Sequence, residues 1–383
     1  MKILAAGGGS GGHVIPVAAV FKELFKKNKS IEIRFWCDKK FKPQAEKIMQ
    51  NEFRGEVKVE SIISGKLRRY NHLTFLQHFT VPSVLFGNFI DLFKNITGLA
   101  QSFVKLIFWR PDVIFCKGGF VCVPIGVAAW ILRIPIVIHD SDAHPGLANR
   151  ILSKFAKRIA TGAPLEYYNY PKNISTYIGI PVMSEYKNYT KKQRNKFKLE
   201  LGFKDDKPLV VITGGGLGAA RINNATVNEL SALTSAAQIV LISGVSQYKE
   251  LSKFNQTKNF YLYDFISNNM WKYLAAADLV VARAGATSIL ELAALAKPTI
   301  LVPNARLTGG HQLKNAKVYE DAGAVQILSD DEIEHDTEKF SNKILTLLND
   351  DKKMSNLGIS FNEFARPNAA EEMSNIMLSQ IKR

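Results

Sequence analysis

The sequence predicts an α/β protein with two Rossmann-like domains, each built around a parallel sheet. Along most of the chain, short apolar runs alternate with stretches of helical periodicity, a pattern typical of parallel strands joined by crossover helices. The stretch 2–24 opens with an apolar run, breaks into a cluster of glycines and resumes with helical spacing. The stretch 208–223 repeats this order of strand, glycine loop and helix start. The repetition predicts a second domain of the same kind.

The size and composition of the chain fit this prediction. Its 383 residues are 46% hydrophobic and 10% aromatic, which is enough for two cores at about 100–200 residues per domain. The 50 lysines and arginines exceed the 34 aspartates and glutamates and give a net charge of +16. This excess favours an anionic partner, such as nucleic acid, an acidic membrane or a phosphorylated substrate, although a generally basic proteome explains it equally well.

Cysteine usage and hydropathy bear on the compartment. Cys37, Cys116 and Cys122 lie in apolar runs without zinc or redox spacing, which favours buried thiols in a reducing cytosol. The first predicted strand begins at residue 2 and leads into glycines, so we expect no signal peptide. No apolar run reaches the ~20 residues that a bilayer-spanning helix needs. We therefore expect a protein that is either soluble or bound at a membrane surface.

Residues 1–180 are predicted to form the N-terminal domain. Its predicted strands occupy the apolar runs 2–6, 31–36, 57–62, 112–115, 134–139, 158–160 and 176–178. Polar or glycine-bearing turns follow three of them, at 7–13, 117–121 and 139–146. Because the carboxyl ends of parallel strands meet at one edge of a sheet, we expect these turns to lie at the same edge.

The loop 7–13, with the sequence GGGSGGH, holds the first candidate functional residues. Its glycines let a ligand approach the backbone, and the free N–H groups of the following helix favour an anion there. Gly7, Gly9 and Gly12 also satisfy the dinucleotide pattern G-x-G-x-x-G, with Asp38 after the second predicted strand, so an NAD site is one interpretation. The helix N-terminus disfavours a charged imidazole, so His13 is a candidate general base; a capping or packing histidine is the alternative.

The stretch 73–109 carries more apolar and aromatic side chains than one buried helix stripe requires. Phenylalanines flanked by cations are what an interfacial membrane patch needs, and the net charge of +16 favours such a patch. Packing entirely within the protein is the alternative. The residues predicted to form the patch are Arg69, Phe75, Phe79, Phe86, Phe89 and Lys94.

A polar, lysine-rich stretch at 181–207 is predicted to link the domains, and residues 208–365 to form the C-terminal domain. Its predicted strands are 209–213, 238–243, 260–263, 278–282, 299–302 and 325–328. The glycine loop at 214–218 opens this domain as the loop 7–13 opens the first. A second loop of this kind is rarely needed by an NAD-dependent enzyme, whereas a glycosyltransferase with two facing domains uses both.

The most specific functional signal lies at 282–293. Thr287 and Glu291 are four residues apart on a predicted helix and therefore share one face. A hydroxyl and free N–H groups suit a diphosphate, and a carboxylate suits the two ribose hydroxyls. The alternative is that Thr287 or Ser288 caps the helix while Glu291 faces water. Further on, Gln312 offers both a donor and an acceptor, as recognition of sugar hydroxyls requires.

Taken together, five stretches resemble the MurG-type N-acetylglucosaminyltransferases of bacterial peptidoglycan synthesis. They are 7–13, 118–121, 214–221, 283–291 and 311–316, in the expected order across both domains. The resemblance implies a GT-B fold, with two Rossmann-like domains facing across a cleft. It implies inverting transfer of GlcNAc from UDP-GlcNAc to the 4-hydroxyl of the muramoyl sugar on undecaprenyl-diphosphate, without metal or cofactor.

The resemblance also implies where the protein acts and how the chain ends. We expect a peripheral enzyme on the anionic cytoplasmic face of the cell membrane, with no nucleic-acid partner. The C-terminal helix at 366–383 is expected to return to the N-terminal domain.

Site residues follow from the same resemblance. His13 is expected to be the catalytic base, with the charge of the leaving UDP offset by helix dipoles and Arg221. The residues expected to bind the donor are Ser10, Gly11, Gly12, Asp142, Met183, Gly216, Ile266, Gly285, Ala286, Thr287, Ser288, Glu291, His311 and Gln312. Those expected to bind the acceptor are Gly9, Ser10, Gly11, Gly118, Gly119 and Asp142.

The chain departs from the family pattern at several of these positions. Asp142 replaces an asparagine, Met183 an arginine that approaches the donor, and Gly216-Leu217 a serine–glutamine pair. Two alternatives therefore stay open: a related GT-B enzyme that uses another UDP-sugar or lipid acceptor, and an inactive homologue at the membrane surface. The pair Asp140-x-Asp142 mimics a metal-binding D-x-D pattern, but no further acidic cluster in the sequence completes a metal site.

Overall fold

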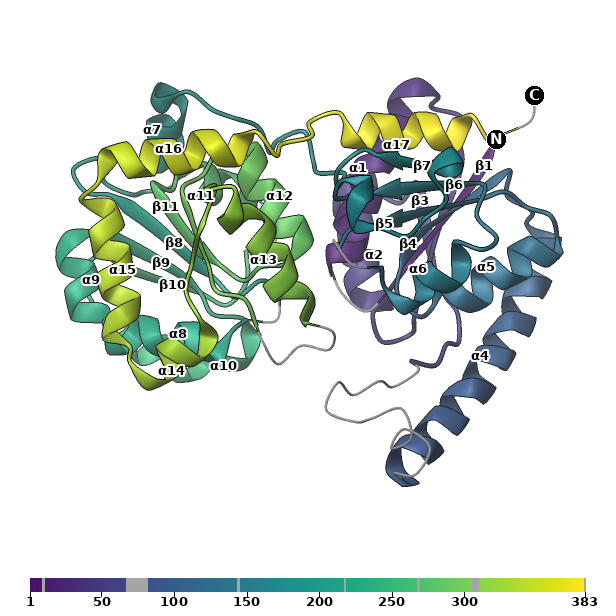
Figure 1. Ribbon diagram of the computed structural model, residues 1–383, viewed down its shortest axis with the longest axis horizontal. Helices are drawn as coiled ribbons and strands as arrows, with labels where there is room; N and C mark the ends of the chain where they lie inside the picture. Colours follow the sequence, from purple (N-terminus) through teal and green to yellow (C-terminus); the bar gives the residue numbers. More distant parts are fainter. Residues whose placement is uncertain are drawn as a thin grey trace. The chain divides into compact units, whose positions relative to one another are not determined.

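The chain folds into two compact units. The computed structural model describes residues 1–8, 11–66, 82–142, 145–216, 218–266, 269–304 and 310–381. Unit 1 consists of Met1–Met183 together with Arg366–Arg383, and unit 2 of Ser184–Ala365 (Figure 1). Both contain a parallel sheet between layers of helices, so the predicted α/β class with two Rossmann-like domains is confirmed.

Unit 1 contains a seven-stranded sheet in the order β3-β2-β1-β4-β5-β6-β7, and every pair of neighbours is parallel. The order reverses between β1 and β4, which is the point where doubly wound sheets place their ligands. The strands are β1 (Lys2–Gly7), β2 (Glu32–Cys37), β3 (Val57–Ser61), β4 (Val113–Gly118), β5 (Ile136–Asp140), β6 (Arg158–Thr161) and β7 (Ser175–Tyr177).

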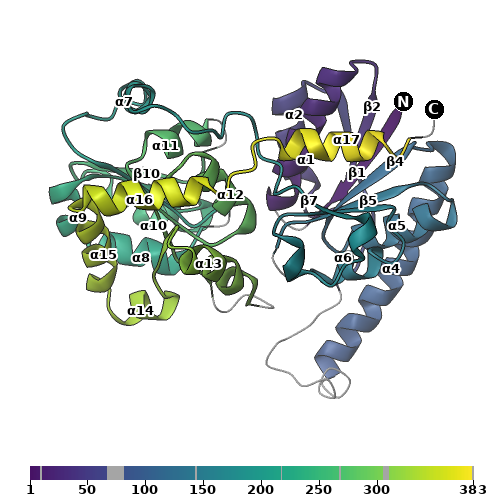
Figure 2. The same cartoon turned by 45° about the horizontal axis from the view of Figure 1, so that its top comes forward.

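Helices cover both faces of this sheet because its strands alternate apolar side chains to both sides. Along β1, Ile3 and Ala5 join the core under one helix layer, and Leu4 and Ala6 the core under the other. The first layer holds α1 (Gly11–Lys27), α2 (Lys42–Phe53) and α17 (Ala369–Leu378). The second holds α4 (Pro82–Phe108), α5 (Cys122–Ile131) and α6 (Leu147–Leu152), and Figure 2 shows the two layers from another side. Two short 3₁₀ turns, η1 (Leu165–Tyr167) and η2 (Lys172–Ile174), precede β7.

The last helix packs within unit 1. Met373 and Met377 of α17 are fully buried in the core that α1 and the sheet share. Lys27 of α1 donates a hydrogen bond to Asn375 Oδ1 at 2.5 Å and pairs with Glu371 at 3.5 Å. Residues from both ends of the chain therefore complete one hydrophobic core.

Unit 2 contains a six-stranded parallel sheet in the order β10-β9-β8-β11-β12-β13. Its strands are β8 (Leu209–Thr213), β9 (Gln238–Ile242), β10 (Phe260–Tyr263), β11 (Leu279–Ala282), β12 (Thr299–Leu301) and β13 (Gln326–Ile327). The segments around them are α7 (Lys191–Glu200), α8 (Ala220–Asn228), α9 (Leu230–Ala236), α10 (Val245–Leu251), η3 (Ser252–Phe254), α11 (Met270–Ala276), α12 (Ala286–Ala294), α13 (His311–Asp321), α14 (Asp330–His335), α15 (Glu338–Leu348) and α16 (Asp351–Asn362).

The stretch 181–207, expected as a linker, is divided between the units after Met183, and most of it packs on unit 2. Thr190 and Gln193 form a capping box that starts α7. The buried ring of Tyr189 stacks on Trp271 of α11 with a centroid distance of 5.8 Å, and Phe197 contacts both rings edge-on. Aromatic packing therefore holds this segment on unit 2. The sequence did not indicate this contact, because the aromatic residues lie among polar ones.

Candidate active site

The glycine loops of unit 1 meet at the carboxyl ends of β1 and β4. Gly7 lies opposite Gly118 in the sheet, and Gly118 and Gly119 have φ values of 124° and 89°. A Cβ atom on Gly119 would lie 2.7 Å from the Gly8 carbonyl oxygen, so only glycine allows this approach. Gly9 and Ser10, expected at the substrate, lie outside the described residues.

His13 lies in the first turns of α1 beside these glycines. Its Nδ1 is hydrogen-bonded to the Gly8 carbonyl, so Nδ1 carries the proton and the Nε2 lone pair is available as a base. Nε2 lies 3.6 Å from where a Cβ on Gly118 would be, which places it against the loop that contains Gly118 and Gly119. Burial and, next, the Lys117 ammonium lower the pKa of His13 below its usual 6.5, although the Gly8 carbonyl, Asp142 and Asp38 act in the opposite direction.

The loop after β5 adds a buried polar cluster behind His13. Lys117, at the end of β4, donates a hydrogen bond to Ser141 Oγ. Burial raises the pKa of Asp140 to about 7, and Tyr170 donates a hydrogen bond to its Oδ2 at 2.8 Å. Asp142 lies in the same loop, where its backbone carbonyl accepts a hydrogen bond from Tyr168 at 2.7 Å. Within the described ranges, no three His, Cys, Asp or Glu side chains are arranged to hold a metal ion.

In unit 2, the first turn of α12 contains the N-terminal backbone N–H groups of the helix. The N-cap residue is Gly285, which brings no side chain, so Ala286, Thr287 and Ser288 form the first turn without a side-chain cap from that position. The positive end of the helix and these N–H groups make the turn suitable for a diphosphate. This turn follows β11, at the carboxyl edge of the second sheet.

Glu291 is buried on α12, one turn after Thr287. Glu291 is only 8% exposed, and its Oε1 has no hydrogen-bond partner among the described residues. The alternative in which Glu291 faces water is therefore wrong. Burial raises the pKa of Glu291 to about 8, because a carboxylate removed from water is costly. Such a group gains free energy when a ligand donates hydrogen bonds to it.

In the glycine loop at 214–218 of unit 2, some glycines are required by close packing and others border open space. A Cβ on Gly218 would collide with the Ser243 carbonyl, and one on Gly214 with the backbone at Ala219. A Cβ on Gly215 or Gly216 would meet nothing within 4 Å. The open positions therefore leave room for a ligand beside the sheet edge.

The remaining candidate residues of unit 2 flank this edge. Ile266 lies in the segment that follows β10, and α13 begins at His311 with Gln312 next. Gln312 Oε1 accepts a hydrogen bond from the Asn304 N–H at 2.9 Å, which fixes the amide with its NH₂ group as a donor. The structure describes the backbone of His311 but not its side chain. Among the donor candidates of unit 1, Met183 ends the first of the two chain segments that form that unit.

Arg221 has a different role from the one expected. Its guanidinium pairs with Asp330 at 2.7 Å and Glu334 at 2.6 Å, both on α14, and lies 3.6 Å from Asp331. Arg283 pairs with the other oxygen of Asp330 at 2.6 Å. Because carboxylates already balance its charge, Arg221 ties α8 to α14, and the expectation that it offsets the leaving UDP is not supported.

Some residues near the site were missed by sequence reasoning. Tyr186 lies near Glu291: burial and, next, the Glu291 carboxylate raise its pKa well above the usual value. Lys117 was missed although a lysine inside the apolar run of β4 is itself a signal. Nothing in the local sequence around Tyr186 indicates its position.

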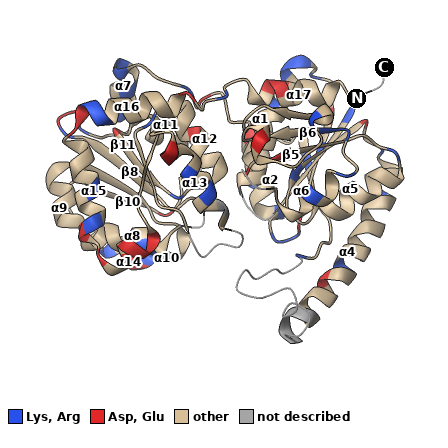
Figure 3. Ribbon diagram, viewed as in Figure 1, with Lys and Arg blue, Asp and Glu red and all other residues tan. Residues whose placement is uncertain are grey.

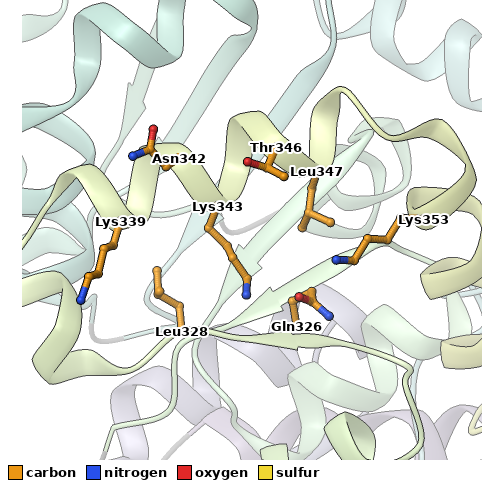
Figure 4. A pocket seen from close by; sticks show the side chains of 8 residues that line it. All are labelled: Gln326, Leu328, Lys339, Asn342, Lys343, Thr346, Leu347 and Lys353. Carbon is orange, nitrogen blue, oxygen red and sulfur yellow. The ribbon is translucent and has the colours of Figure 1, made fainter.

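Two cavities in unit 2 lie away from all these residues. A cavity of about 380 Å³ lies between β13 and α15, where Lys343 and Lys353 point over Gln326 (Figure 4). Another of about 890 Å³ lies at the amino ends of β8 and β11, beside α7 and α16. No predicted site residue lines either cavity, so neither cavity is the candidate active site.

An apolar surface covers α4 of unit 1. Phe86 and Phe89 are 67% and 55% exposed, Phe108 is 85% exposed, and Trp130 at the end of α5 is 53% exposed. The described part of α4 carries few charged side chains (Figure 3), one of them Lys94. Arg69, Phe75 and Phe79 of the predicted patch lie outside the described residues. Across the described parts of the chain, none of the helices combines the length and hydropathy of a membrane span.

Comparison with known proteins defines the class. Residues 3–161 match the glycosyltransferase family 28 N-terminal domain, and residues 209–373 match the glycosyltransferase family 28 C-terminal domain. Together with two doubly wound sheets that carry glycine loops, these matches define a glycosyltransferase.

The relatives narrow the class further. A Thermoanaerobacter protein (strain X514) is 31% identical over 99% of this chain and 100% of its own length, and one from Clostridium kluyveri is 34% identical over 87% of each chain. Both are named UDP-N-acetylglucosamine–N-acetylmuramyl-(pentapeptide) pyrophosphoryl-undecaprenol N-acetylglucosamine transferase. The chain belongs to this MurG-type branch of glycosyltransferase family 28.

Solved structures agree on the fold. MurG of Acinetobacter baumannii is 23% identical, with a TM-score of 0.70 over 99% of both chains. A UDP-GlcNAc 2-epimerase from Neisseria meningitidis, solved with UDP-GlcNAc, is 14% identical, with a TM-score of 0.65 over 99% of this chain and 100% of that one. The predicted GT-B fold is confirmed by these neighbours.

Proposed function

We propose that the protein is an inverting glycosyltransferase that moves GlcNAc from UDP-GlcNAc to the 4-hydroxyl of the muramoyl sugar on undecaprenyl-diphosphate. The observation that carries the proposal is the similarity to relatives of that name along nearly the whole chain. The groups that the reaction needs stand at the carboxyl edges of both sheets, where doubly wound folds bind their ligands.

Unit 2 would hold the donor. The diphosphate would lie against the first turn of α12, and the ribose hydroxyls would donate to the Glu291 carboxylate, whose Oε1 has no partner among the described residues. The Gln312 amide would donate to a GlcNAc hydroxyl, with His311 beside it, and the open Gly216 would let the diphosphate approach the backbone. The donor set is completed by Ile266, Gly285, Ala286, Thr287 and Ser288 of unit 2, and by Ser10, Gly11, Gly12, Asp142 and Met183 of unit 1.

Unit 1 would hold the acceptor and carry out the proton transfer. The N–H groups of the loop 9–11 and of Gly118 and Gly119 would bind the acceptor diphosphate, beside Asp142. His13 Nε2 would accept the proton of the attacking hydroxyl while the new bond to the anomeric carbon forms. The bond from that carbon to UDP breaks in the same step, so the configuration inverts and UDP leaves with the electron pair.

Donor binding can be tested without the lipid acceptor. UDP and UDP-GlcNAc should raise the unfolding temperature, since a ligand at about 100 times its Kd stabilises the native state by about 2.7 kcal/mol. UDP-Glc, which lacks the acetamido group, should stabilise less. Transfer of labelled GlcNAc to the muramoyl lipid then tests the acceptor. A larger shift with another UDP-sugar would support the related transferase, and no shift with any would support the inactive homologue.

We further propose that the enzyme works on the cytoplasmic face of the cell membrane, with the α4 surface against anionic lipid. The exposed phenylalanines would enter the interface, and the net charge of +16 would add electrostatic attraction.

Vesicle sedimentation tests this membrane contact. Wild-type protein should bind vesicles rich in anionic lipid at low salt and be released as salt rises. Phe89→Asp should weaken binding by about tenfold or more, since burying one phenylalanine is worth about 1.5–3 kcal/mol. Ile359→Asp is the matched control, because Ile359 is 63% exposed on α16 of unit 2. Equal binding by the two variants would contradict the proposal.

A further inference from the structure

A buried lysine stands directly behind the first glycine loop. Lys117 is only 1% exposed, although it lies at the end of a strand that leads to a ligand edge. The register between β1 and β4 shifts there: Ala6 pairs with Cys116 but Gly7 pairs with Gly118, so Lys117 has no opposite residue on β1. Such an irregularity changes the direction of a side chain and is common beside active sites.

The surroundings of Lys117 keep its ammonium in one place. Its Nζ donates to Ser141 Oγ, and the carboxylates of Asp140 and Asp142 attract it from the loop after β5. Burial lowers the pKa of Lys117 to about 8, so it still carries a positive charge at neutral pH. The carboxylates of the D-x-D pattern therefore face a lysine in this structure.

His13 and this lysine both approach Gly7. A Cβ on Gly7 would lie 3.3 Å from the His13 Cβ and 3.6 Å from the Lys117 Cβ, so both side chains pack against the same face of this glycine. Among the residues that the structure describes, the groups that act on the imidazole are Lys117 from β4, Asp142 from the loop after β5, Asp38 from the loop after β2 and the Gly8 carbonyl. Of these, only the lysine opposes an added proton.

We propose that Lys117 is a positioning residue that keeps His13 uncharged, so that the imidazole can accept a proton at neutral pH. The proposal rests on the proposed role of His13 as the base. Without the ammonium, burial alone would oppose the imidazolium form, against Asp142, Asp38 and the Gly8 carbonyl. More of His13 would then carry the second proton, which leaves no lone pair for the hydroxyl proton. After transfer, the same repulsion would help the imidazolium release its proton to water.

The test is the titration of His13 in the resting protein, followed by NMR, with His13→Gln to assign its signal. Lys117→Gln keeps a hydrogen-bond donor for Ser141 but removes the charge, and Lys117→Met removes both. Either variant should raise the midpoint of the His13 titration by about one pH unit, the effect of one nearby charge. Lys117→Arg, which keeps the charge, should titrate like the wild type.

Lys297→Met is the matched control for the loss of a buried lysine. Lys297 is fully buried in unit 2, where it donates to the carbonyls of Ala275 and Ala277, and its loss should leave the His13 titration unchanged. An unchanged His13 midpoint in both neutral Lys117 variants would overturn the proposal.

Kinetics separate this proposal from the proposed function. In Lys117→Gln the acid limb of the kcat/KM profile should move up by the same amount, with near-normal rates at high pH, whereas a merely structural role would lower the rate equally at every pH. A shifted titration in a protein without any transfer activity would support the coupling of Lys117 to His13 and would refute the proposed reaction.

Discussion

Replacing His13 with alanine should lower kcat by about 10²–10⁴-fold, the usual contribution of a general base. UDP-GlcNAc binding and the unfolding temperature should change little, because the imidazole is expected to touch the acceptor hydroxyl and not the nucleotide. Single-turnover transfer of labelled GlcNAc measures the effect on the chemical step.

The matched control for His13→Ala is His335→Ala. His335 lies exposed on α14, where its Nδ1 is within 2.7 Å of the Asp331 carbonyl oxygen, and it should be dispensable for turnover. In the wild type, the rate should fall on the acid side with an apparent pKa below 6.5, because the surroundings of His13 lower its pKa. Near-normal turnover by a folded His13→Ala variant would remove His13 from the mechanism.

Replacing Glu291 with alanine should weaken UDP binding by about 10–150-fold, since hydrogen bonds to a charged group contribute about 1.5–3 kcal/mol. In the empty protein, burial raises the pKa of Glu291 to about 8, whereas ribose hydroxyls that donate to it favour the carboxylate. UDP affinity measured by calorimetry should therefore rise between pH 6.5 and pH 8.5. In Glu291→Gln, this dependence on pH should disappear.

Glu291→Gln should also make the protein without UDP more stable. The folded protein holds the Glu291 proton more tightly than the unfolded chain, whose glutamates titrate near 4.5, so this group lowers stability progressively as pH rises from 4.5 through 8. Glu291→Gln should thus raise the unfolding temperature more at pH 8 than at pH 5. Glu338→Gln, at an exposed position of α15, serves as the control. Unchanged UDP affinity in Glu291→Gln would place the ribose elsewhere.

Local patterns were sufficient to predict the strands and loops. The strand predicted at 209–213 coincides with β8, and that at 260–263 with β10, because buried parallel strands are continuous apolar runs between turns. The helix predicted to carry Thr287 and Glu291 is α12, which begins at Ala286 directly after a glycine. These features depend on neighbours along the chain.

Contacts between distant segments could not be predicted in the same way. Lys117, Ser141 and His13 come together only because β4 lies between β1 and β5, and no periodicity encodes that order. Thr287 and Glu291 were predicted to share one helix face, but the burial of Glu291 depends on packing around α12, including Tyr186. Likewise, the pairing of Arg221 with α14 joins residues more than one hundred positions apart.

The placement of α17 has a consequence for how the protein is made. The ribosome finishes residues 1–183 long before it reaches Met373 and Met377, which fill the same core. At about 5–20 residues per second, the intervening segment takes roughly 10–40 s to synthesise. During that interval the nascent first domain lacks its final helix, and the apolar side chains that α17 will cover stay exposed. We expect chaperones to be needed most during this interval.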